Sequence, residues 1–586
     1  MLNNMKKINS LICIALAGLT TVSCEDFLTL MPLNDIVLEN FWTDKSDVES
    51  VLLGAYSALE KSDCVVRMGI WGEMRSDNVK AGKNTSDDIL QITRDNILET
   101  NSYTTYKCFY DVINRANTVL HFAPIVAAED PNYTGAELQA NEAEAIALRS
   151  LSYWYLIRAY KDVPYTTIPS IDDTHDFFIP QTSFDEILDS LIYDLERVKK
   201  YAVNKYPTEN ANTARFTRAA IYAMLADMYL WKGDYDKCIE ACEWVSERKR
   251  FEMLELIDKQ GTDCTIRLFP GELDGSLYDA SDPTYPLITE TPVGKEAGNA
   301  YNENFGTGNS FEILFELPYD QTTSNPFVGT YYNDKNSTIG QLKALPEIGN
   351  GFGNGGVNKV FLSPTDGRYY QNINSDGTGD YGIMKYVYQT IRYDLSSGVV
   401  TGTKTTEKRN NAEPNWVIYR YTDVLLMEAE AKTMKAAALG EDPSFAPERN
   451  QLLAEAFKLV DAVNQRAICK RPYGDNAIEL KASTYATSVE NMENLVLDER
   501  RRELMFEGKR WFDLVRQARR DGNTRRLLQR LSASEKFESS VKSAVTIKLS
   551  DMNALYFPLN KDEIKINTLL KQNPVYIEDE FIQKAK

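Results

Sequence analysis

The run Leu497–Arg516 holds the ionisable side chains whose spacing could do chemistry. If this run is helical, Glu499, Glu503 and Glu507 share one face, because residues four apart are neighbours on a helix surface. Like charges placed in this way repel, so the carboxylates need cations from the run itself or from a neighbouring helix. Paired carboxylates can hydrolyse glycosides, but buried paired charges are commonly structural. We interpret the run as a buried ion-pair network.

Other enzyme motifs are absent from the sequence. It has two histidines, His121 and His175, although histidine is the commonest general base and metal ligand near neutral pH. There is no Gly-x-Ser-x-Gly elbow and no His-Glu-x-x-His helix. The glycines at 351, 353 and 355 are not followed by the Lys-Ser/Thr of a phosphate loop. The sequence therefore predicts no catalytic residue and a protein that is not an enzyme.

One segment has the opening spacing of a calcium loop, with Asn372, Asn374, Asp376 and Gly377. The twelfth position of that loop is Ile383, where an EF-hand needs a bidentate glutamate. This argues against an EF-hand and leaves open a looser calcium site with oxygen ligands. We predict no cofactor and no metal, with structural calcium as the alternative.

The cysteines give no metal site either. Cys238 and Cys242 are four residues apart on a predicted helix, where a zinc site would need a second pair of ligands. No such pair follows in the sequence. We predict that both are buried free thiols, since unpaired cysteine often serves as a small core residue.

The N-terminus has the pattern of an export signal. Lys6 and Lys7 precede the apolar run Leu11–Leu19, and small or β-branched residues lead to Cys24. This order is typical of a secretory signal, and a cysteine at the cleavage point is where a bacterial lipoprotein is acylated. The apolar run is too short to cross a bilayer, which takes roughly 20 helical residues. We predict that residues 1–23 are removed and that Cys24 carries the lipid.

The charge of the chain argues against nucleic acid as a partner. The formal net charge is −20 over 586 residues, with no basic block. Nonspecific nucleic-acid binding depends on lysine and arginine displacing counterions from phosphates. We therefore expect no nucleic-acid partner.

Hydrophobic spacing predicts a mainly α fold. Capping boxes at Ser46–Glu49 and Ser183–Glu186 precede amphipathic patterns, and Glu142–Tyr160 is apolar nearly all round, as a buried helix would be. Arg215–Val245 reads as a helix hairpin with a glycine turn, and Tyr421–Met434 with Leu452–Arg466 as a related pair. These hairpins resemble tetratricopeptide repeats, which stack into a scaffold.

Residues of about 250–415 differ in kind. Glycine, asparagine, proline, serine and tyrosine cluster there between short apolar runs such as Phe311–Leu317. That composition predicts loops with short strands. We expect residues 24–586 to form one domain, with a helical scaffold at about 40–250 and 415–586 and a variable ligand-binding region at about 250–415.

The motifs of the chain, taken in order, resemble those of the SusD/RagB family of outer-membrane nutrient-binding lipoproteins. The landmarks are Cys24–Leu28, Phe41–Trp42, Trp71–Asn78, Asn114–Asn117, Glu144–Tyr155, Asp162–Pro164, Tyr419–Asp423, Leu497–Arg516, Tyr556–Pro558 and Gln572–Tyr576. The resemblance covers nearly the whole chain after the signal.

The resemblance implies a tetratricopeptide scaffold anchored to the outer membrane and exposed at the cell surface. Such a protein covers a SusC-like TonB-dependent transporter and captures oligosaccharides for import. The implied activity is binding without bond cleavage. The alternatives are a receptor for peptides or glycopeptides in the same import system and, less favoured, an extracellular glycoside hydrolase.

Aromatic rings suit sugar binding, because a flat ring offers an apolar face to sugar C–H groups while nearby polar groups supply directed hydrogen bonds. The early loop of the family's starch-binding member carries aromatics, whereas Val79–Asp95 has none, so starch is not the expected ligand. The predicted contact residues are Trp71, Asp77, Asn78, Tyr278, Tyr285, Tyr301, Phe327, Tyr331 and Tyr332.

Overall fold

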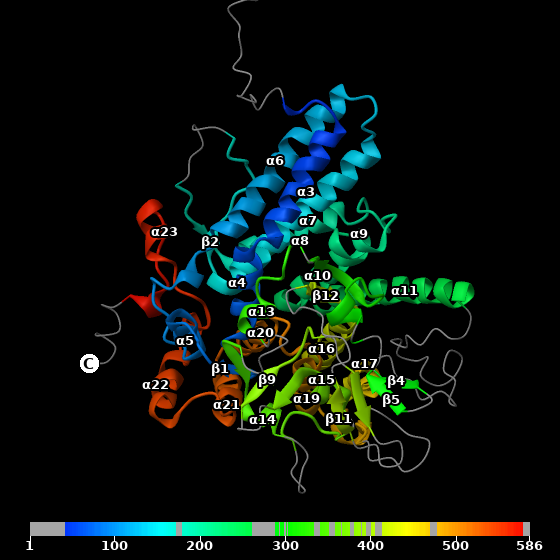
Figure 1. Cartoon of the computed structure of the whole chain (residues 1–586), viewed down its shortest axis with the longest axis vertical. Coiled ribbons are helices and arrows are strands. Elements are labelled where there is room, and N and C mark those ends of the chain that lie inside the picture. Colours follow the sequence, from blue (N-terminus) through cyan, green and yellow to red (C-terminus); the bar gives the residue numbers. More distant parts are fainter. Residues whose placement is uncertain are drawn as a thin grey trace, which may run out of the picture.

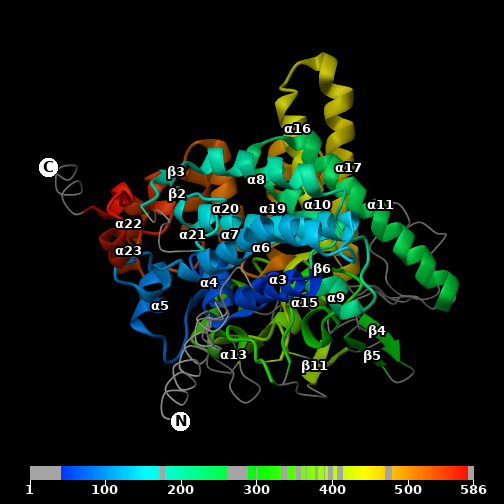
Figure 2. The same cartoon turned by 90° about the horizontal axis from the view of Figure 1, so that it is seen from above.

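The structure is a computed structural model. It describes residues 41–171, 178–260, 288–291, 294–297, 301, 303–320, 322–332, 340–350, 358–364, 366–375, 380–387, 390–393, 400–404, 413–468 and 478–577. Long helices lie side by side, and the short strands between residues 288 and 404 gather on one side of them (Figure 1, Figure 2). No helix within these ranges is both long and apolar enough to cross a membrane.

The helical scaffold is a stack of neighbouring pairs. Its longer helices are α3 (Lys45–Glu60), α6 (Lys107–Glu129), α7 (Gly135–Tyr160), α8 (Phe184–Val198), α10 (Arg218–Lys232), α11 (Tyr235–Gln260), α16 (Tyr421–Ala438), α17 (Ala446–Ala467), α19 (Val489–Leu504) and α20 (Arg510–Asp521). Helices that follow each other in the chain pack together, as α6 on α7, α10 on α11 and α16 on α17. Helix α16 also packs against α11 and α19, so the two predicted hairpins are neighbours although the variable region separates them in sequence.

The mainly α prediction and both hairpins are confirmed. Gly233 ends α10 with φ +82°, a left-handed conformation that glycine adopts without strain. In α7, every residue from Ala143 to Tyr160 is buried. Such burial on all sides follows from its position between α3, α6 and α8.

Capping boxes were predicted at the start of two helices, α3 and α8. Ser183 caps α8 and forms the expected capping box with Glu186. The box predicted at Ser46 is wrong, because the cap of α3 is Asp44, whose carboxylate accepts a hydrogen bond from the Ser46 N–H at 2.7 Å. Aspartate and serine are comparable N-caps, and here the carboxylate lies two residues earlier.

The remaining helices connect these and lie along their edges. They are α4 (Ser62–Glu73), α5 (Asp87–Thr93), α9 (Glu209–Ala214), α13 (Val328–Tyr331), α14 (Pro346–Gly349), α15 (Gly367–Asn372), α18 (Ala482–Tyr485), α21 (Arg525–Ala533), α22 (Ser539–Leu549) and α23 (Lys561–Ile566). Among them, α4 packs against α20 and α3. This brings the predicted Trp71–Asn78 landmark next to the C-terminal helices.

The described strands form small antiparallel sheets. One has the order β1 (Val79–Ala81), β7 (Leu342–Ala344), β9 (Tyr381–Ile383) and β8 (Ile373–Ser375); another has β11 (Val400–Lys404), β10 (Thr390–Tyr393), β5 (Gly294–Ala297) and β4 (Ile288–Thr291). The pairs β2 (Val163–Pro164) with β3 (Gln181–Thr182) and β12 (Trp416–Arg420) with β6 (Ile313–Leu317) complete the set. Val79 pairs with Ala344, so the early loop and the variable region share a sheet.

The β6–β12 pair fastens the variable region to the scaffold. All five residues of each strand are buried, and Trp416 pairs with Leu317. Helix α16 begins at Tyr421, directly after β12. A fully buried short apolar strand is what the run Phe311–Leu317 predicts.

The pH dependence of stability follows in part from Glu316 on β6. Its Oε1 accepts hydrogen bonds from Asn309 N at 2.7 Å and Asn415 Nδ2 at 2.9 Å, while burial raises the pKa of Glu316 to about 7. Between about pH 4.5 and 7 the unfolded chain releases this proton before the folded protein does, so rising pH destabilises the fold. We expect Glu316→Gln to flatten the pH dependence of the urea midpoint over this window.

The matched control for Glu316 is Glu441→Gln, whose side chain is 94% exposed. It should leave the pH dependence as in the wild type. Equal pH profiles for wild type and Glu316→Gln would contradict the argument.

The predicted ion-pair network is confirmed, and it holds the variable region to the scaffold. Glu503 accepts from Arg368 at 2.9 Å, from Arg420 at 2.7 Å and from Arg466. Arg368 belongs to α15, Arg420 to β12 and Arg466 to α17. The full cluster balances Arg368, Lys385, Arg420, Arg466 and Arg502 against Glu312, Asp366, Glu499, Glu503 and Glu507.

The run Leu497–Arg516 is not one continuous helix, although its spacing predicts one. Helix α19 ends at Leu504, and Phe506 has φ +67°, so Glu507 lies in a turn and not on the helix face of Glu499. There Glu507 accepts from Lys385 Nζ at 2.5 Å and from Arg420 Nη2 at 2.9 Å. Four of the five cations of the cluster thus come from other segments of the chain, and Arg502 comes from the run itself.

Candidate ligand-binding site

The structure places Trp71, predicted to contact a ligand, in the core. Its side chain has no exposed surface, its Nε1 donates a hydrogen bond to Tyr103 O at 3.0 Å, and its ring stacks on Phe109. The landmark Trp71–Asn78 is therefore a packing motif at this position.

Asp77 and Asn78 are buried structural groups as well. Arg510 donates to both carboxylate oxygens of Asp77, at 2.7 and 2.9 Å. Burial alone would raise the pKa of Asp77, but Arg501 and Arg510 outweigh it and hold that pKa far below its usual value. Asn78 donates to Glu73 at 2.8 Å and accepts from Arg501 Nε at 2.9 Å.

The four aromatics of the variable region that were predicted as contacts and that the structure describes also point inward. Tyr301, Phe327, Tyr331 and Tyr332 are at most 4% exposed. The hydroxyl of Tyr332 donates to the carbonyl of Phe506 at 2.9 Å. In this structure these rings pack the loops onto the scaffold, so they offer no face to a ligand. Tyr278, Tyr285 and Cys24 lie outside the described residues.

The candidate calcium loop lies partly outside the described residues. Asp376 and Gly377 are among those not described. The side chain of Asn372 is buried and accepts a hydrogen bond from the Tyr301 hydroxyl at 2.5 Å. Within the described ranges, no group of three or more histidine, cysteine, aspartate or glutamate side chains could hold a metal ion.

The predicted state of Cys238 and Cys242 is confirmed, since both are buried and free. Cys64 and Cys108 are free as well. Cys264 and Cys469 lie outside the described residues.

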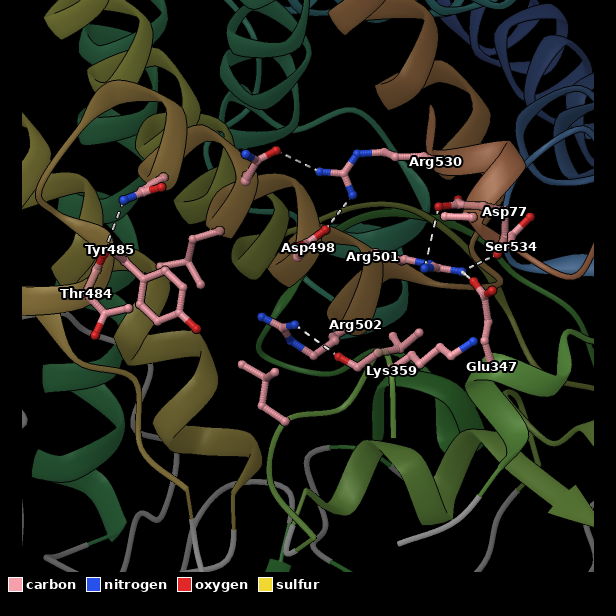
Figure 3. Close-up of a pocket in the computed structure, with 16 residues that line it drawn as sticks. Asp77, Glu347, Lys359, Thr484, Tyr485, Asp498, Arg501, Arg502, Arg530 and Ser534 are labelled. Atoms are coloured by element: carbon pink, nitrogen blue, oxygen red, sulfur yellow. Dashed lines mark hydrogen bonds and ion pairs between the residues drawn. The ribbon is translucent and has the colours of Figure 1, made fainter. Parts of the chain in front are cut away.

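A cavity of about 400 Å³ lies where the C-terminal helices meet the variable region (Figure 3). Its volume falls within the range of small-molecule sites. Most of its lining side chains are polar. The lining consists of Asp77, Glu347, Lys359, Val360, Leu362, Thr484, Tyr485, Asn491, Asn494, Leu495, Asp498, Arg501, Arg502, Arg530, Ala533 and Ser534.

One face of α19 forms the back of the cavity. Asn491, Asn494, Asp498 and Arg501 recur at intervals of three and four residues, which places them on one side of a helix. Tyr485, at the end of α18, and Arg530 of α21 extend this lining at its edges. In Figure 3, Thr484 and Tyr485 lie opposite Asp77, Glu347 and Ser534 across the opening.

Ion pairs fix the positions of the arginines in the cavity. Arg501 donates to Glu347 Oε1 at 2.7 Å and Arg530 donates to Asp498 Oδ1 at 2.6 Å. Burial raises the pKa of Glu347, although Arg501 opposes the shift. Because these side chains are already held in one conformation, they lose little conformational entropy when a ligand binds. Hydrogen bonds from them to a ligand are therefore favoured.

A buried lysine secures the loop that carries Asp77. Lys536 Nζ donates hydrogen bonds to the carbonyls of Met74 and Ser76 at 2.8 Å and of Val79 at 3.0 Å. Burial lowers the pKa of Lys536 to about 8. The segment between α4 and β1 is therefore held from the α21–α22 connection, next to the cavity.

A second hollow, of about 810 Å³, lies between the end of α7 and the C-terminal segment. Its polar groups already pair with each other. Lys161 Nζ donates to Asn553 Oδ1 at 3.2 Å, Asn573 Nδ2 donates to Asn553 O at 2.9 Å, and Lys571 N donates to Gln181 Oε1 at 2.8 Å. We interpret this hollow as part of the contact between the C-terminal segment and the scaffold. The α19 cavity is the candidate site.

This cavity was not predicted from the sequence. The signal for it in the sequence is the polar i, i+3, i+7 and i+10 face of α19, which overlaps the start of the run interpreted as an ion-pair network. Of the seven predicted contact residues that the structure describes, Asp77 alone lies in the lining, as an already paired carboxylate.

The fold and this cavity define a helical-repeat protein with a preformed polar site. Comparisons with known proteins agree on its family. The model described as "SusD family" matches residues 312–576, and the one described as "Starch-binding associating with outer membrane" matches residues 26–230. The chain belongs to the SusD/RagB family.

Relatives in sequence include two proteins of Formosa agariphila. "SusD-like protein P38" is 26% identical over 87% of this chain and 90% of its own length, and "SusD-like protein P2" is 22% identical over 85% and 88%. These alignments span nearly the full length of both partners.

Solved structures share the fold. A SusD superfamily protein from Bacteroides vulgatus matches with a TM-score of 0.62 and 18% identity, over 91% of this chain and all of its own. A structure titled "Laminarin binding SusD-like protein" matches with a TM-score of 0.56 and 19% identity, over 91% of this chain and 99% of its own.

Proposed function

We propose that this protein is a cell-surface lipoprotein, acylated at Cys24, that captures oligosaccharides and passes them to a SusC-like TonB-dependent transporter. The proposal holds that it binds its ligand without cleaving it. Membership of the SusD/RagB family supports the proposal, as does the one family description that mentions starch binding and the outer membrane. In this proposal residues 24–586 act as one binding unit.

The observation that carries the proposal is the polar cavity on α19. Amide, hydroxyl, carboxylate and guanidinium groups converge there from α18, α19, α21 and the variable region. Sugars present hydroxyl groups in pairs, and fixed groups of these kinds bind them with directed hydrogen bonds. The half-buried ring of Tyr485 adds an apolar face for sugar C–H groups.

The test is calorimetric titration of the mature protein against a panel of oligosaccharides and peptides. We expect a saccharide to bind and Tyr485→Ala to weaken it about tenfold, which corresponds to about 1.4 kcal/mol. Glu441→Gln, at the distant end of α16–α17, is the control and should bind as the wild type does. Binding of peptides alone would favour the peptide receptor, and new reducing ends in the mixture would favour a hydrolase.

The anchor and the partner need separate measurements. Mass spectrometry of the membrane fraction should find an acylated Cys24 as the first residue. Affinity purification from detergent extracts should recover a TonB-dependent transporter. A cytosolic product with an unacylated N-terminus would contradict the localisation part of the proposal.

A further inference from the structure

The α19 cavity is more cationic than the chain around it. The chain as a whole has a formal net charge of −20. The charged groups of the lining are Lys359, Arg501, Arg502 and Arg530 against Asp77, Glu347 and Asp498. The lining therefore has one more cation than carboxylates. Whether this charge can reach a ligand depends on how the groups are paired.

Each carboxylate of the lining already holds a guanidinium. Asp77, which is 1% exposed, accepts hydrogen bonds from Nε and Nη2 of Arg510, a residue outside the lining. Glu347 accepts from Arg501 at 2.7 Å and Asp498 from Arg530 at 2.6 Å. An arriving ligand therefore meets carboxylates whose charge is largely neutralised by their partners.

Of the four cations in the lining, Lys359 has the longest and most exposed ion pair. Among the described residues its ion pair is with Glu535, at 3.9 Å, and the two side chains are 65% and 53% exposed. Exposed pairs at this separation contribute little, so the ammonium group can exchange Glu535 for a ligand at low cost.

The position of Lys359 is nevertheless well defined. The next residue, Val360, is 5% exposed, and its carbonyl accepts a hydrogen bond from Arg502 Nη1 at 3.1 Å. Through this contact, α19 holds the backbone of the segment. Figure 3 shows the Lys359 side chain beside Glu347 and Arg501 at the cavity.

We infer that the oligosaccharide bound in this cavity is anionic, carrying carboxylate groups of uronic acids or sulfate esters. The inference rests on the proposed function and adds the substrate class. Lys359 would contact the anionic substituent directly, with Arg501 and Arg530 as flanking donors. The acidic remainder of the chain opposes this only weakly, because charges farther away than about 8 Å are screened at physiological salt.

The test uses the mature, full-length protein and three oligosaccharide sets of matched length: neutral, uronate-containing and sulfated. We expect at least one anionic set to bind about tenfold or more tightly than the neutral set, with an affinity that falls as salt is raised. The two anionic arms separate carboxylate from sulfate.

Lys359→Gln should weaken binding of the anionic oligosaccharide about tenfold, remove much of the salt dependence, and weaken binding of neutral sugars by a smaller factor. The matched control is Lys565→Gln, a lysine 68% exposed on α23 whose replacement should change none of these values. Tighter binding of the neutral set, or an unchanged salt response in Lys359→Gln, would overturn the inference while the proposed function stands. Failure of all three sets to bind would overturn the proposed function.

Discussion

Replacing Glu503 with glutamine is expected to lower the free energy of unfolding by about 3–5 kcal/mol, the usual cost of removing one partner from a buried ion pair. Glutamine has the same shape but leaves the guanidinium groups of Arg368, Arg420 and Arg466 with one negative charge too few. Those groups are at most 3% exposed, so water cannot compensate them. Urea unfolding followed by circular dichroism measures the loss.

The pH dependence of this effect has a definite sign. Burial alone would raise the pKa of Glu503, but the three arginines outweigh it and hold the pKa well below the usual value of 4.5. A carboxylate with a lowered pKa stabilises the fold while it is ionised, and this stabilisation is lost as the pH falls through the folded-state pKa. The difference between wild type and Glu503→Gln should therefore shrink in acid.

Glu441→Gln is again the matched control. Its partner Arg449 lies at 3.9 Å and Glu441 is 94% exposed, so the change should cost less than about 1 kcal/mol. If Glu503→Gln cost no more than this control, the network would not carry the stability that we assign to it.

Replacing Gly72 with alanine is expected to cost about 3 kcal/mol or more, the upper part of the range for overpacked sites. A Cβ at position 72 would lie 1.7 Å from the carbonyl oxygen of Gly508. That atom belongs to backbone in the turn that follows α19, and the carboxylate of Glu73 holds the same turn by accepting from Gly508 N at 3.2 Å. Neither α4 nor the turn can move aside without breaking buried contacts.

Gly135→Ala is the control for this substitution. Nothing lies within 4 Å of a Cβ at Gly135, which is the first residue of α7. Alanine there should be neutral or stabilise the fold by up to about 1 kcal/mol, since it restricts the unfolded chain. Equal urea midpoints for the two variants would show that α4 and the turn do not approach as closely as the structure has them.

The helices and their pairing in hairpins could be predicted because their determinants are local. Capping at Ser183, the glycine turn at Gly233 and the apolar spacing of α7 are properties of neighbouring residues. The shift of the α3 cap from Ser46 to Asp44 shows the limit, since two good caps two residues apart compete on nearly equal terms.

The predicted contact residues show why loop composition is a weak guide to a binding site. A tyrosine in a segment rich in glycine and asparagine can face a ligand or pack the segment onto the scaffold. Tyr332 is buried because β1 pairs with β7 and brings the loops down onto α4 and the α19 turn. Sequence spacing contains no information about that approach.

By itself, the sequence determined the mainly α repeat scaffold, the loop-rich insertion, the family and the presence of a charged network in the run Leu497–Arg516. Each of these depends on residues close together in the chain or on the order of motifs along it. Only the tertiary structure decided which arginines meet Glu503, which aromatics are buried, and that Lys359, Tyr485, Arg501 and Arg530 surround one cavity. These groups come from segments that are far apart in sequence, and they meet because burying the apolar faces of the helices fixes where each segment ends.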